Sequence, residues 1–442
     1  MHILRRWFAV SAAGLVAALS LVPTGASAGT LPCPALGPLQ QTGTLGQAAG
    51  EPTNATIGIS GLAVSRFDSE TTGEQIAWAV GDRSANELAG TDEVFLFGLD
   101  ARDGSLAIRY PLDPAGFQDD PVEPTADTIT KLGQTMNPIP DFEDLSIEDA
   151  SRGPGQIWLF DTGDNGGSRS TLNAYVVGEP DLSGEPPVTA RVGAGMSATT
   201  VALGKRPSPS PSPSPSPSPS PSPSPSTVPG PSFLTSHPAL DGALTGQVLP
   251  VVRYPIRLMK GGVPVTPNVE AAFVDTGNAG TGSAPVYLIA KSPVDADGDG
   301  VRTDFRIFRF TTRNTAASGL TNDALYVGTI SFAQADLKVT AASILDDGSA
   351  LVVRAVNGGS LRPDLDVVGL WWRAAGTTIE SEIVLRPTPD CRWSLNSAPD
   401  SSSEETIAFD LTDATGAGFE GFVWTHDIRG VAAPYFTAPR TG

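Results

Sequence analysis

Short apolar runs rich in Val, Ile, Phe and Trp recur along the 442-residue chain, and Gly, Asp, Asn and Pro bound them. The runs have the length and composition of β-strands, and no long stretch shows the periodicity of an amphipathic helix. They recur as pairs, in which a first strand with a small or acidic opening leads into a more apolar second strand. Five such pairs occupy residues 59–67 with 75–84, 142–150 with 156–165, 269–277 with 284–292, 339–348 with 349–357, and 404–412 with 419–427.

Further strands follow most of these pairs. Third strands are predicted at 93–100, 172–180, 305–312 and 367–374, and fourth strands at 106–113, 324–332 and 378–387. Five units of about four strands predict an all-β chain folded as a β-propeller, with a sixth blade left open. A pair of β-sandwiches is the alternative, but it does not explain the recurrent pairing. Because the last unit is short of strands, we expect the segment near Cys33 to supply its outermost strand.

Residues 207–226 are ten consecutive Pro-Ser pairs. Every second residue of this tract lacks an amide donor, so the tract can join neither a helix nor a sheet. We expect residues 205–230 to form a disordered loop inserted in one propeller domain that spans 29–442. A linker between two domains remains the alternative, since composition alone marks the tract.

The first 28 residues have the features of a secretory signal. Arg5 and Arg6 precede an apolar run, and the small residues that end at Ala28 fit a cleavage site. We therefore expect a secreted protein that is either free or associated with the cell wall and is not stably inserted in a membrane. We also expect a monomer. The net charge of −20 argues against nucleic acid as the partner. The expected partner is an extracellular ligand of unknown identity, either a cell-wall component or a small molecule.

The two cysteines, Cys33 and Cys391, lie near opposite ends of the exported chain. An oxidising compartment permits a disulfide between them. Such a bridge would help to hold the ring of blades closed.

Antiparallel neighbours place the start of each first strand beside the end of the second strand, so these positions share one rim of the propeller. We expect Glu143, Glu270 and Glu405 to face the central axis. The first-strand openings supply Ser60, Glu143, Asp144, Glu270, Glu404 and Glu405, and the second-strand ends supply Asp82, Asp161, Asp164, Asn165, Lys291, Arg354 and His426.

Carboxylates gathered at one rim repel one another unless a cation compensates them. One compensation is Ca²⁺, which takes several oxygen ligands. The other is internal pairing with Arg169, Lys291 and Arg354, and the sequence leaves both open. The candidate ligands of the ion are Glu143, Asp144, Asp161, Asp164, Glu270 and Glu405. The other candidate ligand-binding residues of the rim are Asp82, Asn165, Arg169, Lys291 and Arg354.

A second candidate Ca²⁺ site is the stretch DADGDG, in which Asp295, Asp297 and Asp299 alternate with small residues. The twelfth position of an EF-hand loop requires a bidentate glutamate, but Arg306 stands there. The alternative is a plain Asp/Gly turn in a hairpin.

Two functions fit these residues. The first is an extracellular binding or scaffold propeller with Ca²⁺ at its acidic rim. The second is a metal-dependent hydrolase, such as a phosphoesterase or lactonase, in which the same carboxylates hold the ion and a rim acid or His426 moves protons. Fold alone does not choose between them, so catalytic activity stays open.

Several segments occur in the order found in one known family: SGLAVSR, DFEDLSI, IWLFDTGDNGGSR, AYVVGEPD, RYP and VEAAFVD. The chain resembles a family of secreted, largely actinobacterial β-propeller proteins of uncharacterised function, which carry SGL, DWED, GDIGDN, EP and YP…EA motifs. The resemblance implies a propeller but no reaction. The chain departs from the family pattern at Phe142, where tryptophan is usual, and at Val269, where aspartate is usual. The positions that match the family pattern are Asp141, Glu143, Asp144, Asp161, Asp164, Asn165, Arg169 and Glu270.

Overall fold

A computed structural model gives the structure of the chain, which divides into two units, Met1–Pro32 and Cys33–Gly442. The first unit, with the predicted signal segment, lies outside the described residues. The predicted Pro-Ser loop 205–230 also lies outside them. The structure describes residues 33–37, 40–44, 59–68, 75–81, 94–104, 106–117, 140–148, 155–163, 169, 171–180, 248–278, 283–296, 298–357, 366–395, 406–411, 419–425 and 434–441.

The described strands form five successive groups, which we number as blades 1 to 5. Neighbouring strands within each blade are antiparallel. Blade 1 is β3 (Ile59–Asp68), β4 (Gln75–Gly81), β5 (Phe95–Asp100) and β6 (Leu106–Pro111); blade 2 is β7 (Asp144–Glu148), β8 (Gln156–Asp161), β9 (Leu172–Gly178) and β10 (Val252–Lys260); blade 3 is β12 (Val269–Val274), β13 (Val286–Ala290), β14 (Asp304–Phe310) and β15 (Asn322–Ser331); blade 4 is β16 (Leu337–Ile344), β17 (Ala350–Asn357), β18 (Val367–Trp372) and β19 (Cys391–Ser394); blade 5 is β20 (Ala408–Leu411), β21 (Phe419–Thr425) and β22 (Pro434–Thr441) with the N-terminal β1 (Ala35–Leu36) and β2 (Gln40–Thr44).

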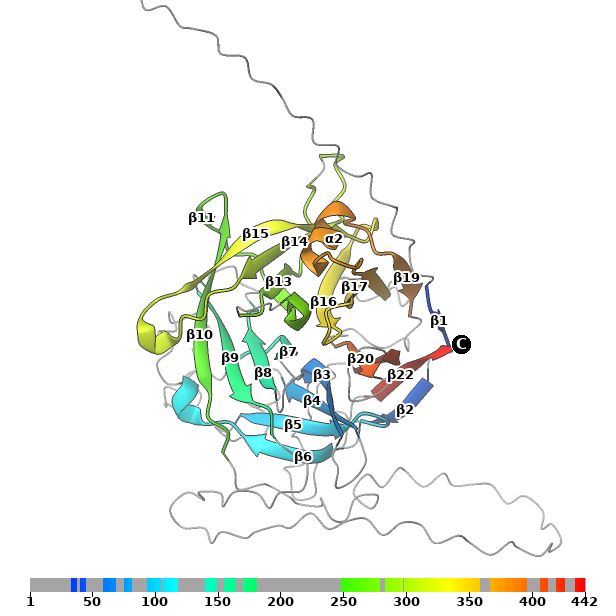
Figure 1. Ribbon diagram of the computed structural model, residues 1–442. Helices are drawn as coiled ribbons and strands as arrows, with labels where there is room; N and C mark the ends of the chain where they lie inside the picture. The colour runs from blue at the N-terminus through cyan, green and yellow to red at the C-terminus, as the bar shows by residue number, and fades with distance from the viewer. Residues whose placement is uncertain are drawn as a thin grey trace, which may run out of the picture. The chain divides into compact units, whose positions relative to one another are not determined.

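The first strand of each blade lies at the centre of a ring. β3 contacts β7, β7 contacts β12, β12 contacts β16, β16 contacts β20, and β20 returns to β3. Figure 1 shows β3, β7, β16 and β20 near the middle and β6, β10 and β19 towards the outside. This closed order of inner strands confirms the predicted all-β propeller, and the described residues hold five blades.

The N-terminal strands complete blade 5. β1 and β2 both pair with β22, although almost the whole chain separates them in sequence. Cys33, just before β1, forms a disulfide with Cys391 at the start of β19 in blade 4. The structure therefore confirms the prediction that the segment near Cys33 completes blade 5. It also confirms the disulfide between Cys33 and Cys391.

Blades 2 and 3 are joined at their outer edges as well as at the centre. β10 pairs with β9 on one side and with β15, in parallel, on the other. The two blades thus form one sheet of eight main strands, with the short β11 (Val263–Pro264) paired to β10. Because β7 also contacts β12, this sheet closes on itself around its own apolar core.

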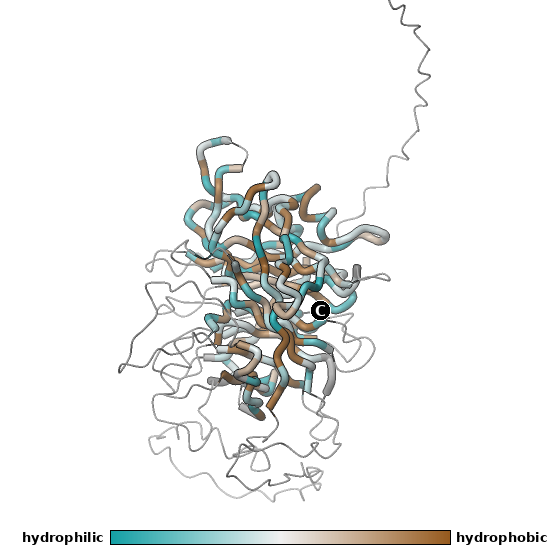
Figure 2. The backbone as a smooth tube through the Cα atoms, turned by 90° about the vertical axis from the view of Figure 1, so that its left-hand side faces the viewer, coloured by the Kyte–Doolittle hydropathy of each residue, from teal (hydrophilic) through white to brown (hydrophobic). Residues whose placement is uncertain are grey.

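The core lies between the blades because each strand contributes apolar side chains to two interfaces. Successive side chains of a strand point to opposite faces. In β8, Ile157 and Leu159 join the cluster shared with blade 1, whereas Trp158 and Phe160 join the cluster shared with blade 3. This explains why second strands are apolar at every position. In the side view of Figure 2, apolar stretches run through the middle of the described strands.

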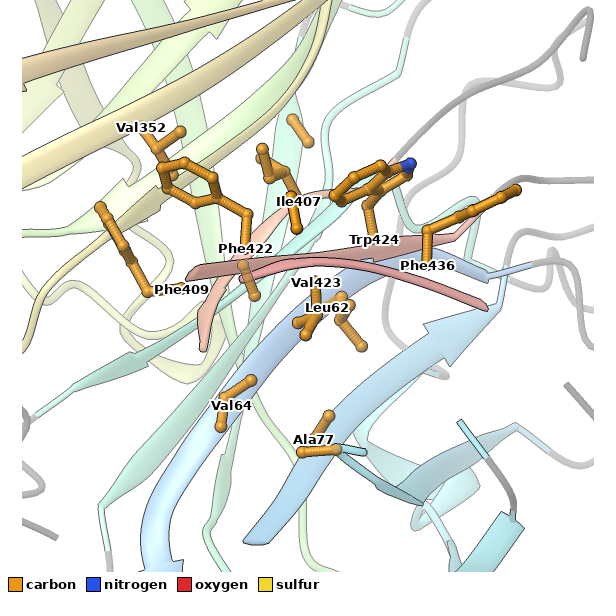
Figure 3. Close-up of a cluster of buried hydrophobic side chains, with 14 of the residues drawn as sticks. Leu62, Val64, Ala77, Val352, Ile407, Phe409, Phe422, Val423, Trp424 and Phe436 are labelled. Carbon is orange, nitrogen blue, oxygen red and sulfur yellow. The ribbon is translucent and has the colours of Figure 1, made fainter. Parts of the chain in front are cut away.

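The interface that closes the ring is the most aromatic one. Blade 5 contributes Phe409, Phe422 and Trp424 to a cluster that also includes Leu62 of blade 1 and Val352 of blade 4. Figure 3 shows Phe422 and Trp424 on one side of β21 and Val423 on the other, beside Leu62.

The predicted strand at 378–387 is wrong, because this segment forms the helix α2 (Ile379–Leu385). Thr378 caps the helix by accepting from Ser381 N at 3.1 Å, and Ser381 Oγ accepts from Thr378 N at 3.1 Å. This reciprocal capping satisfies two amides at the start of the helix. The fourth strand of blade 4 is instead β19. In the described part of the chain, no helix combines the length and hydropathy of a membrane span.

Candidate functional site

Four inner strands open with the same backbone irregularity. The strand registers skip one residue between Ile59 and Gly61, between Val269 and Ala271, and between Val339 and Ala341. In blade 2, Glu143 N donates to Phe160 O while Asp144 is also opposite Phe160. Such β-bulges redirect a side chain at the end of a strand. The bulged residues are Ser60, Glu143, Glu270 and Thr340, and all four are polar and buried. We call the end of the propeller where these residues lie the opening rim.

The ends of the second strands at this rim bond to the next blade. Thr162 Oγ1 donates to Val269 O at 3.0 Å, which joins blade 2 to blade 3. Val339 N donates to Lys291 O at 3.0 Å, which joins blade 3 to blade 4. Arg354 Nη1 donates to Thr406 O at 2.9 Å, which joins blade 4 to blade 5. At the opening rim, these polar contacts fix blades 2, 3, 4 and 5 to one another.

Asp161 is held by an arginine of its own blade. Arg169 Nη1 and Nη2 donate to the two carboxylate oxygens of Asp161 at 2.7 and 3.0 Å, and Nη1 also donates to Gly163 O at 2.9 Å. A two-pronged arginine–carboxylate pair fixes geometry as well as charge. Gly163 in turn lies against the side chain of Glu143. This arrangement brings together Glu143, Asp161 and Arg169.

Glu270 is paired in the same way in blade 3. Its Oε1 accepts from Lys291 Nζ and from Asn268 Nδ2, the latter at 2.8 Å. Lys291 is the residue that follows the second strand, and its side chain is 20 % exposed. Glu270 is thus held within its own blade, beside the end of β13.

Arg354 is fully buried in blade 4 and bonds both oxygens of Asp366, at 3.1 and 2.7 Å. Its guanidinium lies 5.9 Å from the ring centroid of Trp424 in blade 5. A buried charge requires such a partner, because unpaired burial is costly. The sequence pointed to Arg354 but gave no signal for Asp366.

Asp144 lies at the centre of the propeller. Its Oδ2 accepts from Ala272 N of β12 at 2.8 Å and from Ala342 N of β16 at 3.1 Å, and its Oδ1 accepts from Leu145 N at 2.8 Å. The residue is 1 % exposed. Burial raises the pKa of Asp144 well above its usual range, and the three amide donors offset part of that rise.

Two hydroxyls of the opening rim are buried without a hydrogen-bond partner. They are Ser60 Oγ in blade 1 and Thr340 Oγ1 in blade 4, which occupy equivalent bulges. Thr406 Oγ1, near the start of blade 5, accepts from Thr425 N at 2.9 Å. Among the described residues, these rim positions thus carry hydroxyls in blades 4, 5 and 1 and carboxylates in blades 2 and 3.

The predicted Ca²⁺ hairpin is only partly described. Asp295 accepts from Gly298 N at 2.7 Å and from Gly300 N at 3.0 Å, and Asp299 accepts from Val301 N at 2.7 Å. These are the contacts of an Asp/Gly turn. The remaining predicted residues, Asp82, Asp164, Asn165, Asp297, Glu405 and His426, lie outside the described residues.

Within the described ranges, no group of three or more His, Cys, Asp or Glu side chains is placed to hold a metal ion.

One buried carboxylate that the sequence did not single out is Glu179, which accepts from Ser65 Oγ, Trp78 Nε1 and Gly155 N at 2.6, 2.9 and 2.9 Å. It joins blade 1 to blade 2. Only the EP motif of the resemblance marked this position.

No family model and no curated protein matches the chain. Among solved structures, the Dos1 propeller matches with a TM-score of 0.26 and 9 % identity, over 83 % of this chain and 52 % of that chain. The β-propeller domain of Cps50 (Swd1) from Myceliophteria thermophila matches with a TM-score of 0.30 and 8 % identity, over 87 % of this chain and 97 % of that chain. The chain spans about half the length of the Dos1 chain that it matches. The ring of inner strands, and not these scores, defines the chain as a β-propeller.

Proposed function

We propose that this chain is an extracellular binding or scaffold propeller whose ligand face is the opening rim. The observation that carries the proposal is the repeated bulge, which places a polar side chain at the same point of four inner strands. Binding residues held by a rigid scaffold need little reordering when a ligand arrives. Hydrogen bonds between blades, and ion pairs within blades 2, 3 and 4, supply that rigidity here.

The charges of the rim suit a ligand with groups of both signs. Arg169 and Lys291 are 21 % and 20 % exposed, and each stands beside a buried carboxylate of the same blade. Such alternating charges favour ligands whose own charges alternate. A bacterial cell-wall polymer with carboxylates and amines on its peptide stems has this chemistry, which agrees with the proposed export.

Calcium at the rim, and with it a metal-dependent hydrolase, stays a prediction. Among the candidate ligands of the ion, Asp161 forms an ion pair with Arg169 and Glu270 forms one with Lys291. Asp144 accepts hydrogen bonds from three backbone amides. An ion would have to displace these partners, so the contacts support the binding function over the hydrolase. Melting of the full chain in Ca²⁺ and in chelator tests the ion directly: a stabilisation by Ca²⁺ that Glu143→Gln abolishes would establish it.

Cosedimentation with purified peptidoglycan tests the binding function. We expect the wild type to sediment with the wall, and Lys291→Met and Arg169→Gln to reduce the bound fraction severalfold while circular dichroism stays native. Arg257→Ala is the matched control, because Arg257 pairs with Asp323 on the outer edge. If folded rim variants sediment like the wild type, or if the control loses as much, the rim is not the ligand face.

A further inference from the structure

The centre of the propeller collects backbone N–H groups. β7 and β12 run in parallel there, since Asp144 accepts from Ala272 N and, two residues later, Ser146 Oγ accepts from Val274 N at 3.1 Å. An inner strand has no neighbouring strand of its own sheet on the axis side, so its amides there need other acceptors. Side chains of β7 supply them.

One carboxyl group receives amides from three blades. Leu145 N comes from blade 2, Ala272 N from blade 3 and Ala342 N from blade 4. Blade 1 lies against the same point, since a Cβ built on Gly61 would be 2.7 Å from both Asp144 C and Leu145 N. Only glycine at position 61 lets β3 approach this closely.

Convergent backbone amides form a natural anion-binding concavity. They are fixed by the sheets before any ligand arrives, so they need no rearrangement to bind negative charge. The group that occupies them, a planar carboxyl with both oxygens hydrogen-bonded, is the size of a formate ion.

We propose that the axis of this propeller is an anion-binding site built from the amides of blades 2, 3 and 4, which the chain fills with its own carboxylate, Asp144. The site takes small monocarboxylates when that side chain is removed. Its role in the intact protein is to join the inner strands of three blades through one buried carboxyl group. The proposal does not depend on the function of the opening rim.

The test is rescue of Asp144→Ala by formate. We expect the full-length variant to melt several degrees below the wild type, and formate to restore part of that loss in a saturable way, compared with chloride at equal ionic strength. Acetate should restore less and propionate least, because the vacated volume is that of a carboxyl group. The wild type should show no such response.

Two controls separate this site from general salt effects. Asp410→Ala removes a carboxylate of β20 whose pKa is raised by burial and by Glu420, with no amide or cation stabilising its charge, so it should not respond to formate. Asp144→Asn keeps the shape but turns a donor towards an amide donor, so it should be destabilised without rescue. If Asp144→Ala is too unstable to melt, its refolded yield in formate against chloride gives the same comparison.

Three results would overturn the proposal. One is an Asp144→Ala protein as stable as the wild type. Another is an equal formate response, in melting or refolded yield, of Asp144→Ala and Asp410→Ala. The third is a Ca²⁺ stabilisation of the wild type that Asp144→Ala loses, which would make Asp144 a metal ligand instead.

Discussion

Gly163 lies directly against the carboxylate of Glu143: a Cβ built on the glycine would stand 1.7 Å from Glu143 Oε1 and 2.7 Å from its Cδ. The turn after β8 therefore reserves the space above the bulge of β7 for one acidic side chain. The same turn accepts from Arg169 through Gly163 O. One glycine thus positions three charged groups of the opening rim.

Gly163→Ala should displace the Glu143 side chain and lower the free energy of unfolding by about 1–3 kcal/mol, the usual cost of overpacking. In a Glu143→Ala background the same change should cost much less, because the contacting carboxylate is gone. Urea denaturation of the four proteins measures this coupling. An equal cost in both backgrounds would contradict the contact.

Arg169→Ala should be strongly destabilising, because it leaves the buried carboxylate of Asp161 without its paired charge. Loss of one partner of a buried pair costs about 3–5 kcal/mol, and the partial exposure of Arg169 places the expected loss at about 2–4 kcal/mol. Arg257→Ala, in a pair with both side chains exposed, should cost less than about 1 kcal/mol. Similar losses in the two variants, measured by urea denaturation, would show that Asp161 does not depend on this arginine.

The propeller could be predicted because its strands carry their own signal. In β8, every residue from Ile157 to Phe160 is apolar, since one interface takes the odd positions and the other takes the even ones. The joined outer edges of blades 2 and 3 could not be predicted in this way. They depend on the pairing of β10 with β15, and no local pattern specifies a partner so far away in sequence.

The helix α2 was missed although it has a local signal. Thr378 and Ser381 stand at the spacing of a capping box, and Glu382 pairs with Arg386 one turn later. The expectation of a fourth strand outweighed these residues. Tertiary packing supports the helix further, since Val384 lies over Gly328 of β15.

The candidate site was predicted as a group, but its members separate in the structure. Glu143 occupies the bulge at the rim, and the next residue, Asp144, faces the centre. The change of side-chain direction along a strand gives this distinction in principle. The partners of Arg354 and Asp144 could not be found, because Asp366 and the amides of Ala272 and Ala342 carry no sequence signal.

Replacement of Cys33 and Cys391 by alanine should destabilise the propeller by about 2–5 kcal/mol, because the disulfide closes a very long loop. It joins blade 4 to the N-terminal strands that complete blade 5, so its loss should first release β1 and β2. Hydrogen exchange of residues 35–44 measures this local opening. Unchanged protection there, together with unchanged global stability, would show that strand pairing alone closes the ring.

Asp410 of blade 5 should make the stability of the propeller depend on pH. Burial, with a smaller contribution from Glu420, raises its pKa from 3.8 to about 6. Since the folded state favours the protonated form, the contribution of Asp410 to stability is complete below pH 3.8 and is lost as the pH rises through about 6. Asp410→Asn cannot ionise, so relative to the wild type it should gain up to about 2–3 kcal/mol between pH 4 and pH 8. Glu420→Gln should give a smaller gain of the same sign. Urea denaturation across this range measures both, and a constant difference between Asp410→Asn and the wild type would mean that Asp410 has an ordinary pKa.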